Sequence, residues 1–219
     1  WRARLPWLAV AWAPLLAALL VQARGTEGAE GRFQAEAISL WVAVACCAHF
    51  PHLIKHAYLL ILMPACGLLA GHLLVGGTAA ELPPLFALYA GLGLVAYGLA
   101  ALGARIGAPA SLASLLALAV VTAGMCGLFW ADDLAEQVAL EERARVRQAV
   151  LHLDATTALA EDVSHYERLH APLVYRSVPL AASSIGRPTA YETAALWFVP
   201  GLLLLALSWI VPSVPARTD

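Results

Sequence analysis

The sequence predicts an all-α polytopic membrane protein with about six transmembrane helices and a small helical extracytoplasmic insertion before the last helix. The first observation is composition, because 61% of the 219 residues are hydrophobic and 13% are charged. Soluble domains have about 45–50% apolar and about 25% charged residues. The second is the placement of charge, since ten of the fifteen acidic side chains fall in residues 131–192. Long apolar stretches flank this polar segment, so the rest of the chain is expected in a membrane.

Six stretches are expected to form the spans, because a transmembrane helix needs about 20 mostly apolar residues. The second is the weakest, since Pro51 and His52 interrupt it. Only Ala104–Ala108 separates the fourth from the fifth, which predicts a tight helical hairpin. Residues 1–130 then hold the first five helices, residues 131–192 the extracytoplasmic segment, and residues 193–219 the sixth helix and a tail. The expected spans are Leu5–Gln22, Ala37–Ile54, Ala57–Gly76, Pro84–Gly103, Pro109–Trp130 and Thr193–Pro212.

The charges of the connections predict how the chain crosses the membrane. The N-terminus, the second and fourth connections and the C-terminal tail contain five basic residues and one acid, Asp219. The other connections contain fourteen acids and eight arginines. Short cytoplasmic loops are enriched in Lys and Arg. Both termini are therefore expected in the cytoplasm, with residues 131–192 outside the inner (plasma) membrane.

The outer segment is expected to be mostly helical. Residues from Leu134 to about Leu153 contain no Gly or Pro and are rich in strong helix formers, which predicts one helix. On this helix Val146, Val150 and Leu153 make a short apolar stripe suited to packing. A second helix is expected at roughly Ala158–Leu169. The segment is too small for a large core, so it is expected to pack on the bilayer surface, on the outer ends of the spans, or on a partner.

Reactive side chains are densest from Cys46 to His56, where His49, His52 and Lys55 also lie. On one helix face, thiolates and imidazoles at this spacing could bind copper, zinc or haem. Pro51 breaks the helical register, however, and the segment lies at an expected membrane interface where polar groups reach water. An interfacial turn is the better interpretation, and neither a metal site nor any other cofactor is expected.

Two other groups of polar side chains have both a functional and a structural interpretation. His72 lies near the outer end of the third span, where an ionisable group is often functional but more often interfacial. Asp154, His152 and His165 could belong to a hydrolase or zinc site on the outer helices, although a solvated face is the simpler interpretation. No nucleophile elbow, zinc-protease motif or phosphate-binding loop occurs. No catalytic residue is therefore assigned, and no nucleic-acid partner is expected.

The layout resembles the permease half of ABC-2-type exporters, with six spans, a basic N-terminus and an outer helical segment between the last two spans. The resemblance implies a subunit that moves a substrate across the inner membrane and works as an oligomer. It also implies that any ATPase activity lies on a separate cytoplasmic subunit. The family's ATPase contact is the loop between the second and third spans, which here is a short turn with Phe50, His52, Lys55 and His56.

The alternative is a non-catalytic structural or docking subunit of a larger membrane complex, with the outer helices as its docking surface. The small number of charges inside the spans favours this alternative, because ion and proton paths usually need them. Gly91, Gly93 and Gly98 in the fourth span predict close helix packing, either within a compact bundle or at a dimer seam.

Overall fold

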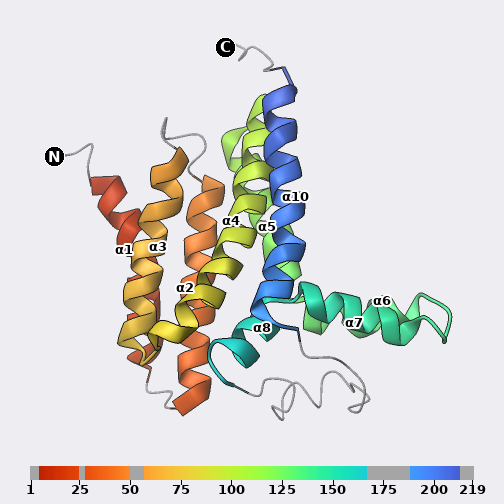
Figure 1. Cartoon of the computed structure of the whole chain (residues 1–219). Helices are drawn as coiled ribbons and strands as arrows, with labels where there is room; N and C mark the ends of the chain where they lie inside the picture. Colours follow the sequence, from red (N-terminus) through yellow and green to blue (C-terminus); the bar gives the residue numbers. More distant parts are fainter. Residues whose placement is uncertain (1–4, 25–27, 50–56, 167–187, 213–219) are drawn as a thin grey trace.

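The computed structural model describes residues 5–24, 28–49, 57–166 and 188–212, and these ranges contain helices and turns with no strand. Six long helices run side by side (Figure 1). Each corresponds to one expected span, so the all-α architecture is confirmed for the described part of the chain. The six are α1 (Leu5–Gln22), α2 (Gly28–His49), α3 (Ala57–Leu74), α4 (Leu82–Arg105), α5 (Ala110–Met125) and α10 (Ala190–Ile210).

Consecutive long helices alternate in direction, so their ends collect at two opposite ends of the bundle (Figure 1). The lower end in that view carries the last turns of α1 and α3, the first turns of α2, α4 and α10, and the short helices of the polar segment. The upper end carries the tight turn between α4 and α5. The expected hairpin is present there, and Gly107 takes a positive φ of 79° that suits glycine.

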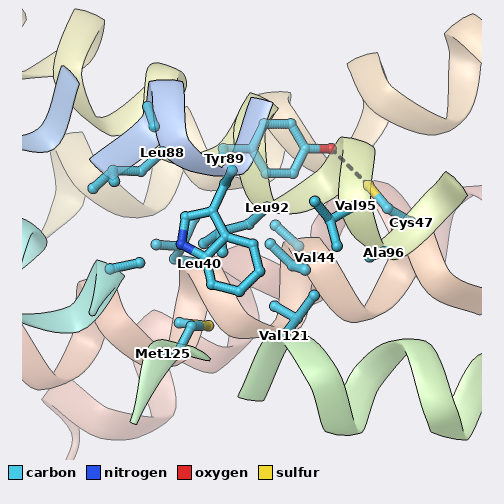
Figure 2. Close-up of a cluster of buried hydrophobic side chains, with 14 of the residues drawn as sticks. Leu40, Val44, Cys47, Leu88, Tyr89, Leu92, Val95, Ala96, Val121 and Met125 are labelled. Atoms are coloured by element: carbon cyan, nitrogen blue, oxygen red, sulfur yellow. Dashed lines mark hydrogen bonds between the residues drawn. The ribbon is translucent and has the colours of Figure 1, made fainter. Parts of the chain in front are cut away.

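The core of the bundle forms where α2 meets α4 and α5 (Figure 2). α2 also packs on α1 and α3, so it contacts helices on both sides, while α10 makes its main contact with α4. Most of the buried side chains shown in Figure 2 are apolar, and the Tyr89 hydroxyl lies 3.4 Å from the Cys47 sulfur. The labelled apolar residues are Leu40, Val44, Leu88, Leu92, Val95, Ala96, Val121 and Met125.

Glycines allow α4 and α10 to approach closely. A Cβ added at Gly98 would lie 2.8 Å from the Cβ of Leu204, and one added at Gly201 would lie 2.8 Å from the Cβ of Leu94. Gly91 packs against the same helix. Real Cβ atoms do not approach so near, so the two backbones occupy space that only glycine leaves open. The glycines at positions 91 and 98 therefore support close packing within the chain.

Within the part of the chain that the structure describes, two helices are long and apolar enough to cross a membrane, Ala79–Arg105 and Ala190–Ile210. The first of these is α4 preceded by the short helix η2 (Ala79–Glu81). Three other apolar helices are shorter over the residues whose side chains are described: Trp12–Gln22, Leu62–Leu74 and Ala110–Met125. The length and apolar composition of these two helices thus agree with a membrane protein.

The outer segment differs from the predicted continuous helix over Leu134–Leu153. It forms α6 (Ala131–Glu136) and α7 (Arg143–Leu153), which are separated by turns. Arg147 Nε donates to Asp132 Oδ1 at 2.5 Å, which ties α7 back to α6. The prediction was wrong because tertiary pairing of the two pieces outweighed the high helix propensity of the residues between them.

The following helix also begins and ends earlier than predicted. α8 covers Ala155–Asp162 rather than Ala158–Leu169. It begins at Ala155 because the Asp154 side chain accepts hydrogen bonds from the backbone N–H groups of Thr156 and Thr157, which caps the first turn. Another short helix, η3 (Gly127–Phe129), follows α5 and leads into α6.

Trp197 joins α10 to both α5 and the outer segment. Its indole N–H donates to the Leu153 carbonyl at 2.9 Å. The ring fits against Gly124 of α5, where an added Cβ would lie 2.0 Å from the indole Cζ2. The side chain is nearly buried, so this contact fixes where α7 meets the bundle.

We predict that Gly201→Leu destabilises the contact between α4 and α10, because Leu94 and the backbone N–H of Val95 already lie within 3.0 Å of an added Cβ. Overpacking of this kind costs about 1–3 kcal/mol. The measurement is the midpoint of thermal unfolding of the purified protein in detergent. Ala206→Leu is the matched control, because Ala206 is exposed on the same helix. Equal midpoints for the two variants would contradict the close packing.

Candidate functional site

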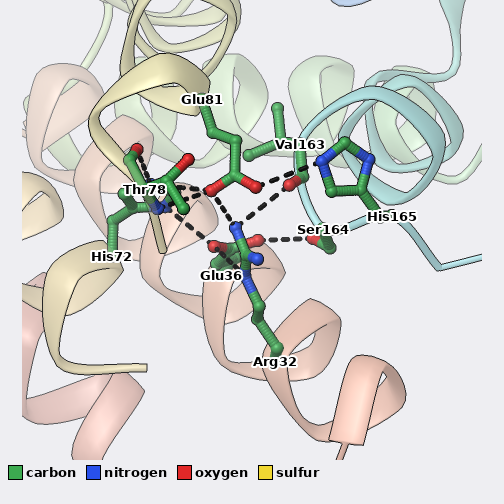
Figure 3. A network of polar contacts seen from close by, with 8 residues as sticks. All are labelled: Arg32, Glu36, His72, Thr78, Glu81, Val163, Ser164 and His165. Carbon is green, nitrogen blue, oxygen red and sulfur yellow. Dashed lines mark hydrogen bonds and ion pairs between the residues drawn. The ribbon is translucent and has the colours of Figure 1, made fainter. Parts of the chain in front are cut away.

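Four charged side chains meet at the lower end of the bundle, and we call them the clasp: Arg32, Glu36, His72 and Glu81 (Figure 3). Arg32 and Glu36 come from α2, His72 from α3, and Glu81 from η2. His72, Glu36 and Glu81 are 1%, 2% and 7% exposed, respectively. Charges so deeply buried are costly unless they are paired, so the pairing of these groups decides whether this end of the bundle is stable.

Local sequence brings the clasp residues together. Arg32 and Glu36 are four residues apart, which places them on one face of α2. This pairing lets α2 begin at Gly28, well before the apolar stretch predicted from Ala37. After α3 the chain turns at Gly76 (φ 86°), and Gly77 packs flat against the His72 ring, where an added Cβ would lie 2.3 Å from ring atoms. The turn therefore requires glycine at both positions.

Arg32 connects the two carboxylates. Its Nε donates to Glu36 Oε1 at 3.1 Å, and its Nη2 donates to Glu81 Oε2 at 2.5 Å. Burial opposes the guanidinium charge, but the hydrogen bond to Glu81 and the nearby charge of Glu36 outweigh it, so the pKa of Arg32 is raised above its ordinary value. Glu81 Oε2 also accepts from the backbone N–H of Thr78 at 2.6 Å, which further favours the ionised carboxylate.

The hydrogen bonds of His72 indicate that its ring is an imidazolium. Nε2 lies 3.0 Å from the Thr78 carbonyl oxygen, which can only accept, so Nε2 carries a hydrogen. Nδ1 lies 2.8 Å from Glu36 Oε1. The same oxygen accepts from Arg32 Nε, so it acts as an acceptor at this point and Nδ1 is the donor. Two cations and two anions then cancel within the clasp.

A short stretch after α8 is seated on the clasp, and we call this stretch, Val163–Tyr166, the strap (Figure 3). The Val163 carbonyl accepts from Arg32 Nη2 at 3.0 Å, and the Ser164 hydroxyl hydrogen-bonds to Glu36. His165 Nε2 lies 3.1 Å from Glu81 Oε1. Tyr166 stacks on Phe33 of α2 with ring centroids 5.4 Å apart. The clasp therefore holds the outer segment against the helix ends.

The chemistry of the clasp is that of a buried, charge-balanced acid–base cluster. Over the described ranges, no group of three or more His, Cys, Asp or Glu side chains is placed to hold a metal ion. Arg32 lies between the two carboxylates, and its charge already occupies the position that a cation would take. The arrangement suits holding elements together and exchanging a proton.

The residues predicted for a partner contact, Phe50, His52, Lys55 and His56, lie outside the described residues. Nearby, the His49 side chain is exposed and Cys47 is buried against Tyr89. The structure therefore does not bring these two together, and the predicted contact remains a prediction.

The predicted apolar stripe lies on α7. Val150 is buried, and Val146 and Leu153 are half-buried. Val150 packs near Gly127 of η3, where an added Cβ would lie 3.3 Å from Val150 Cγ1. The Leu153 carbonyl accepts from Trp197. At its C-terminal half the stripe thus faces the ends of α5 and α10.

The interpretation of Asp154 as part of a solvated face is wrong. Asp154 is fully buried, and besides capping α8 its Oδ2 accepts from the backbone N–H of Leu128 at 2.8 Å. This side chain therefore joins the start of α8 to η3. His165, by contrast, is exposed at the surface of the clasp. His152 Nδ1 lies 3.9 Å from Glu192 Oε2.

Sequence analysis singled out His72 but not its partners. Two signals were available for them. Arg32 and Glu36 stand four residues apart just before an apolar run, and Thr78 precedes Glu81 by three, the spacing of a capping box. Neither signal says that the two pairs lie in contact, because that depends on how α2 packs against α3.

We predict that Glu36→Ala strongly destabilises the protein, because Arg32 and His72 then lose the carboxylate that both contact. Breaking a buried ion pair costs about 3–5 kcal/mol. Denaturant unfolding in detergent measures the loss. Glu30→Ala is the control, since Glu30 is exposed on the same helix and surface changes stay within about 0.5 kcal/mol. A loss no larger than the control's would mean that the clasp adds nothing to stability.

No protein-family model, curated protein or solved structure matches this chain. The helix layout, the exposed apolar faces and the clasp are therefore the features of this chain that bear on its function.

Proposed function

We propose that this chain is a six-span inner-membrane protein that serves as the permease-type subunit of an ABC-2-like export complex. Support for membrane insertion comes from the two helices of sufficient length and from the apolar side chains that α5 and α10 expose along their length. Lipid is the solvent in which such faces are stable. Exposed examples are Leu115, Leu116, Leu203, Leu207, Trp209 and Ile210.

In this proposal the lower end of the bundle faces outward and the upper end faces the cytoplasm. The lower end carries the acid-rich outer segment, while Arg105 lies exposed at the upper end. Lys and Arg are favoured in short cytoplasmic loops. Consecutive long helices alternate in direction, so the described connections lie in turn at the outward end and at the cytoplasmic end of the bundle.

The observation that carries the permease proposal is the place of the outer helices. α6, α7 and α8 lie between α5 and the last long helix, α10, at one end of a bundle of six long helices. This order matches the layout of the ABC-2 permease half. The bundle interior where α2 meets α4 and α5 is apolar. The substrate path is therefore proposed between two copies of the subunit.

A specific observation favours a second candidate, the non-catalytic docking subunit. The buried charges at the lower end are paired with one another and hold the strap, which is a structural arrangement. α6 and α7 also extend sideways from the bundle (Figure 1). Leu140, in the turns between them, is 80% exposed, and this projecting part offers a surface to an extracytoplasmic partner.

We predict that the outer segment faces out of the cell and that the turn between α4 and α5 faces the cytoplasm, and cysteine labelling measures this. In a background without the native cysteines, Ala144→Cys should react with an impermeant thiol reagent in intact cells or spheroplasts. Ile106→Cys should react only after the membrane is opened. Both positions are exposed, so accessibility within the fold does not distinguish them. Labelling of position 106 alone in intact cells would invert the proposed topology.

We predict that exchanging Lys55 and His56 for Glu releases a copurifying cytoplasmic ATPase while leaving membrane insertion intact. The reason is that this turn supplies the cationic groups of the proposed contact, whereas other basic residues still fix orientation. Partners are identified by mass spectrometry after native purification. Arg145→Glu is the matched control, since its side chain is 79% exposed on the outer segment.

The two candidate functions differ in this experiment. Loss of an ATPase only from the Lys55 and His56 variant supports the permease. Retention of every cytoplasmic partner there, with loss of an outer partner from the Arg145 variant, supports the docking subunit. Purification of the wild-type chain with no partner would contradict both.

A further inference from the structure

We propose that the clasp is a proton-operated release for the outer segment: the strap Val163–Tyr166 stays seated while His72 carries its proton, and comes away when His72 loses it. The proposal requires only the contacts of the clasp, and it stands whether the chain is a permease or a docking subunit. It rests on the position of the buried His72 ring. One ring nitrogen faces the Thr78 carbonyl oxygen, which can only accept, and the other faces the Glu36 carboxylate, which holds the strap.

The fixed acceptor determines what deprotonation does. The Thr78 carbonyl can only accept, so a neutral His72 keeps its hydrogen on Nε2. Nδ1 then presents a lone pair to Glu36 Oε1 at 2.8 Å, where an attractive contact becomes a repulsive one. The clasp is left with one uncompensated negative charge in a buried site. Glu36 must turn away, and Ser164 loses the carboxylate to which it is hydrogen-bonded.

The groups around His72 single it out as the one that responds near neutral pH. Among the described residues, Arg32 and Glu36 face it from α2, and Glu81 faces it from η2 at 3.5 Å. Arg32 stays cationic at this pH, and its hydrogen bond to Glu81 helps to hold the pKa of that carboxyl well below its usual range. On the strap, His165 faces Glu81 and is 66% exposed at its side chain.

The strap contains one residue in an uncommon backbone conformation. His165 has a φ of 51°, in the left-handed region that non-glycine residues seldom adopt, although histidine is among those found there more often. Residues in such conformations persist only when the surrounding contacts hold them there. The seated strap therefore depends on the clasp contacts, and it relaxes when they are lost.

The direction of the pH response follows from where the proton is bound. The seated state binds a proton on His72 that the released state gives up more easily, so seating is favoured at low pH and weakens as pH rises. Once the pH exceeds the pKa of His72 in the released state, each further pH unit shifts the seating equilibrium by about tenfold, until the seated His72 also loses its proton.

The test is amide hydrogen exchange of the full chain in lipid nanodiscs, followed by mass spectrometry of a peptide that contains residues 160–166. Exchange is measured from about pH 6 to about pH 9 and corrected for the intrinsic effect of pH on exchange. The variants are His165→Gln and the pair His72→Gln with Glu36→Gln. The pair replaces one positive and one negative charge by neutral amides, so the clasp stays neutral.

The expected result is that protection of the wild-type strap falls with rising pH, by up to about tenfold per unit. His165→Gln should keep this fall, and the double variant should show protection that does not change with pH. Wild-type protection that is constant over the range would overturn the proposal. So would a pH-dependent fall that persists in the double variant, or one that disappears in His165→Gln, since another group would then be the sensor.

Discussion

The removal of four charges from water at one end of the bundle is the constraint on which the rest of the structure depends. Burying a single ion costs several kcal/mol even after the protein relaxes. Arg32, Glu36, His72 and Glu81 meet this cost by cancelling one another at hydrogen-bonding distances. They come from α2, α3 and η2, so the start of α2, the end of α3 and the turn before α4 must be brought together before all four charges are paired.

The clasp and the apolar core act at different levels of the same bundle. In the core, side chains of α2, α4 and α5 interdigitate, and glycines let α4 and α10 meet at backbone distance. The apolar contacts of the core have no preferred direction, and the contacts at the glycines depend on how closely the two backbones fit. The clasp adds directional contacts at one end, where the outer segment returns to the helices. Trp197 and Asp154 complete this joint by binding the Leu153 carbonyl and the Leu128 N–H. The outer segment is therefore fixed to the bundle at several points.

Much of the architecture could be predicted from the sequence because apolar length and charge placement are local properties. They predicted six helices, the hairpin at Ala104–Ala108, and a helical polar segment before the last helix. The break between α6 and α7 could not be predicted in this way, since residues 137–142 are good helix formers and the salt bridge of Arg147 with Asp132 arises only after folding. The clasp was missed for the same reason. His72 stood out as an ionisable residue in an apolar run, but its partners at positions 36 and 81 are joined to it by packing alone.

The central claim is that a protonated His72 balances the charges of the clasp, and nitrogen NMR of the histidine ring tests it most directly. Protein labelled with ¹⁵N at the histidine rings would be compared at neutral pH with the His72→Gln variant, whose missing signals identify the residue. The structure predicts that both ring nitrogens of His72 carry hydrogen, with the resonances of an imidazolium. A neutral ring with a single N–H, and therefore a clasp with unbalanced charge or a protonated Glu36, would contradict the account.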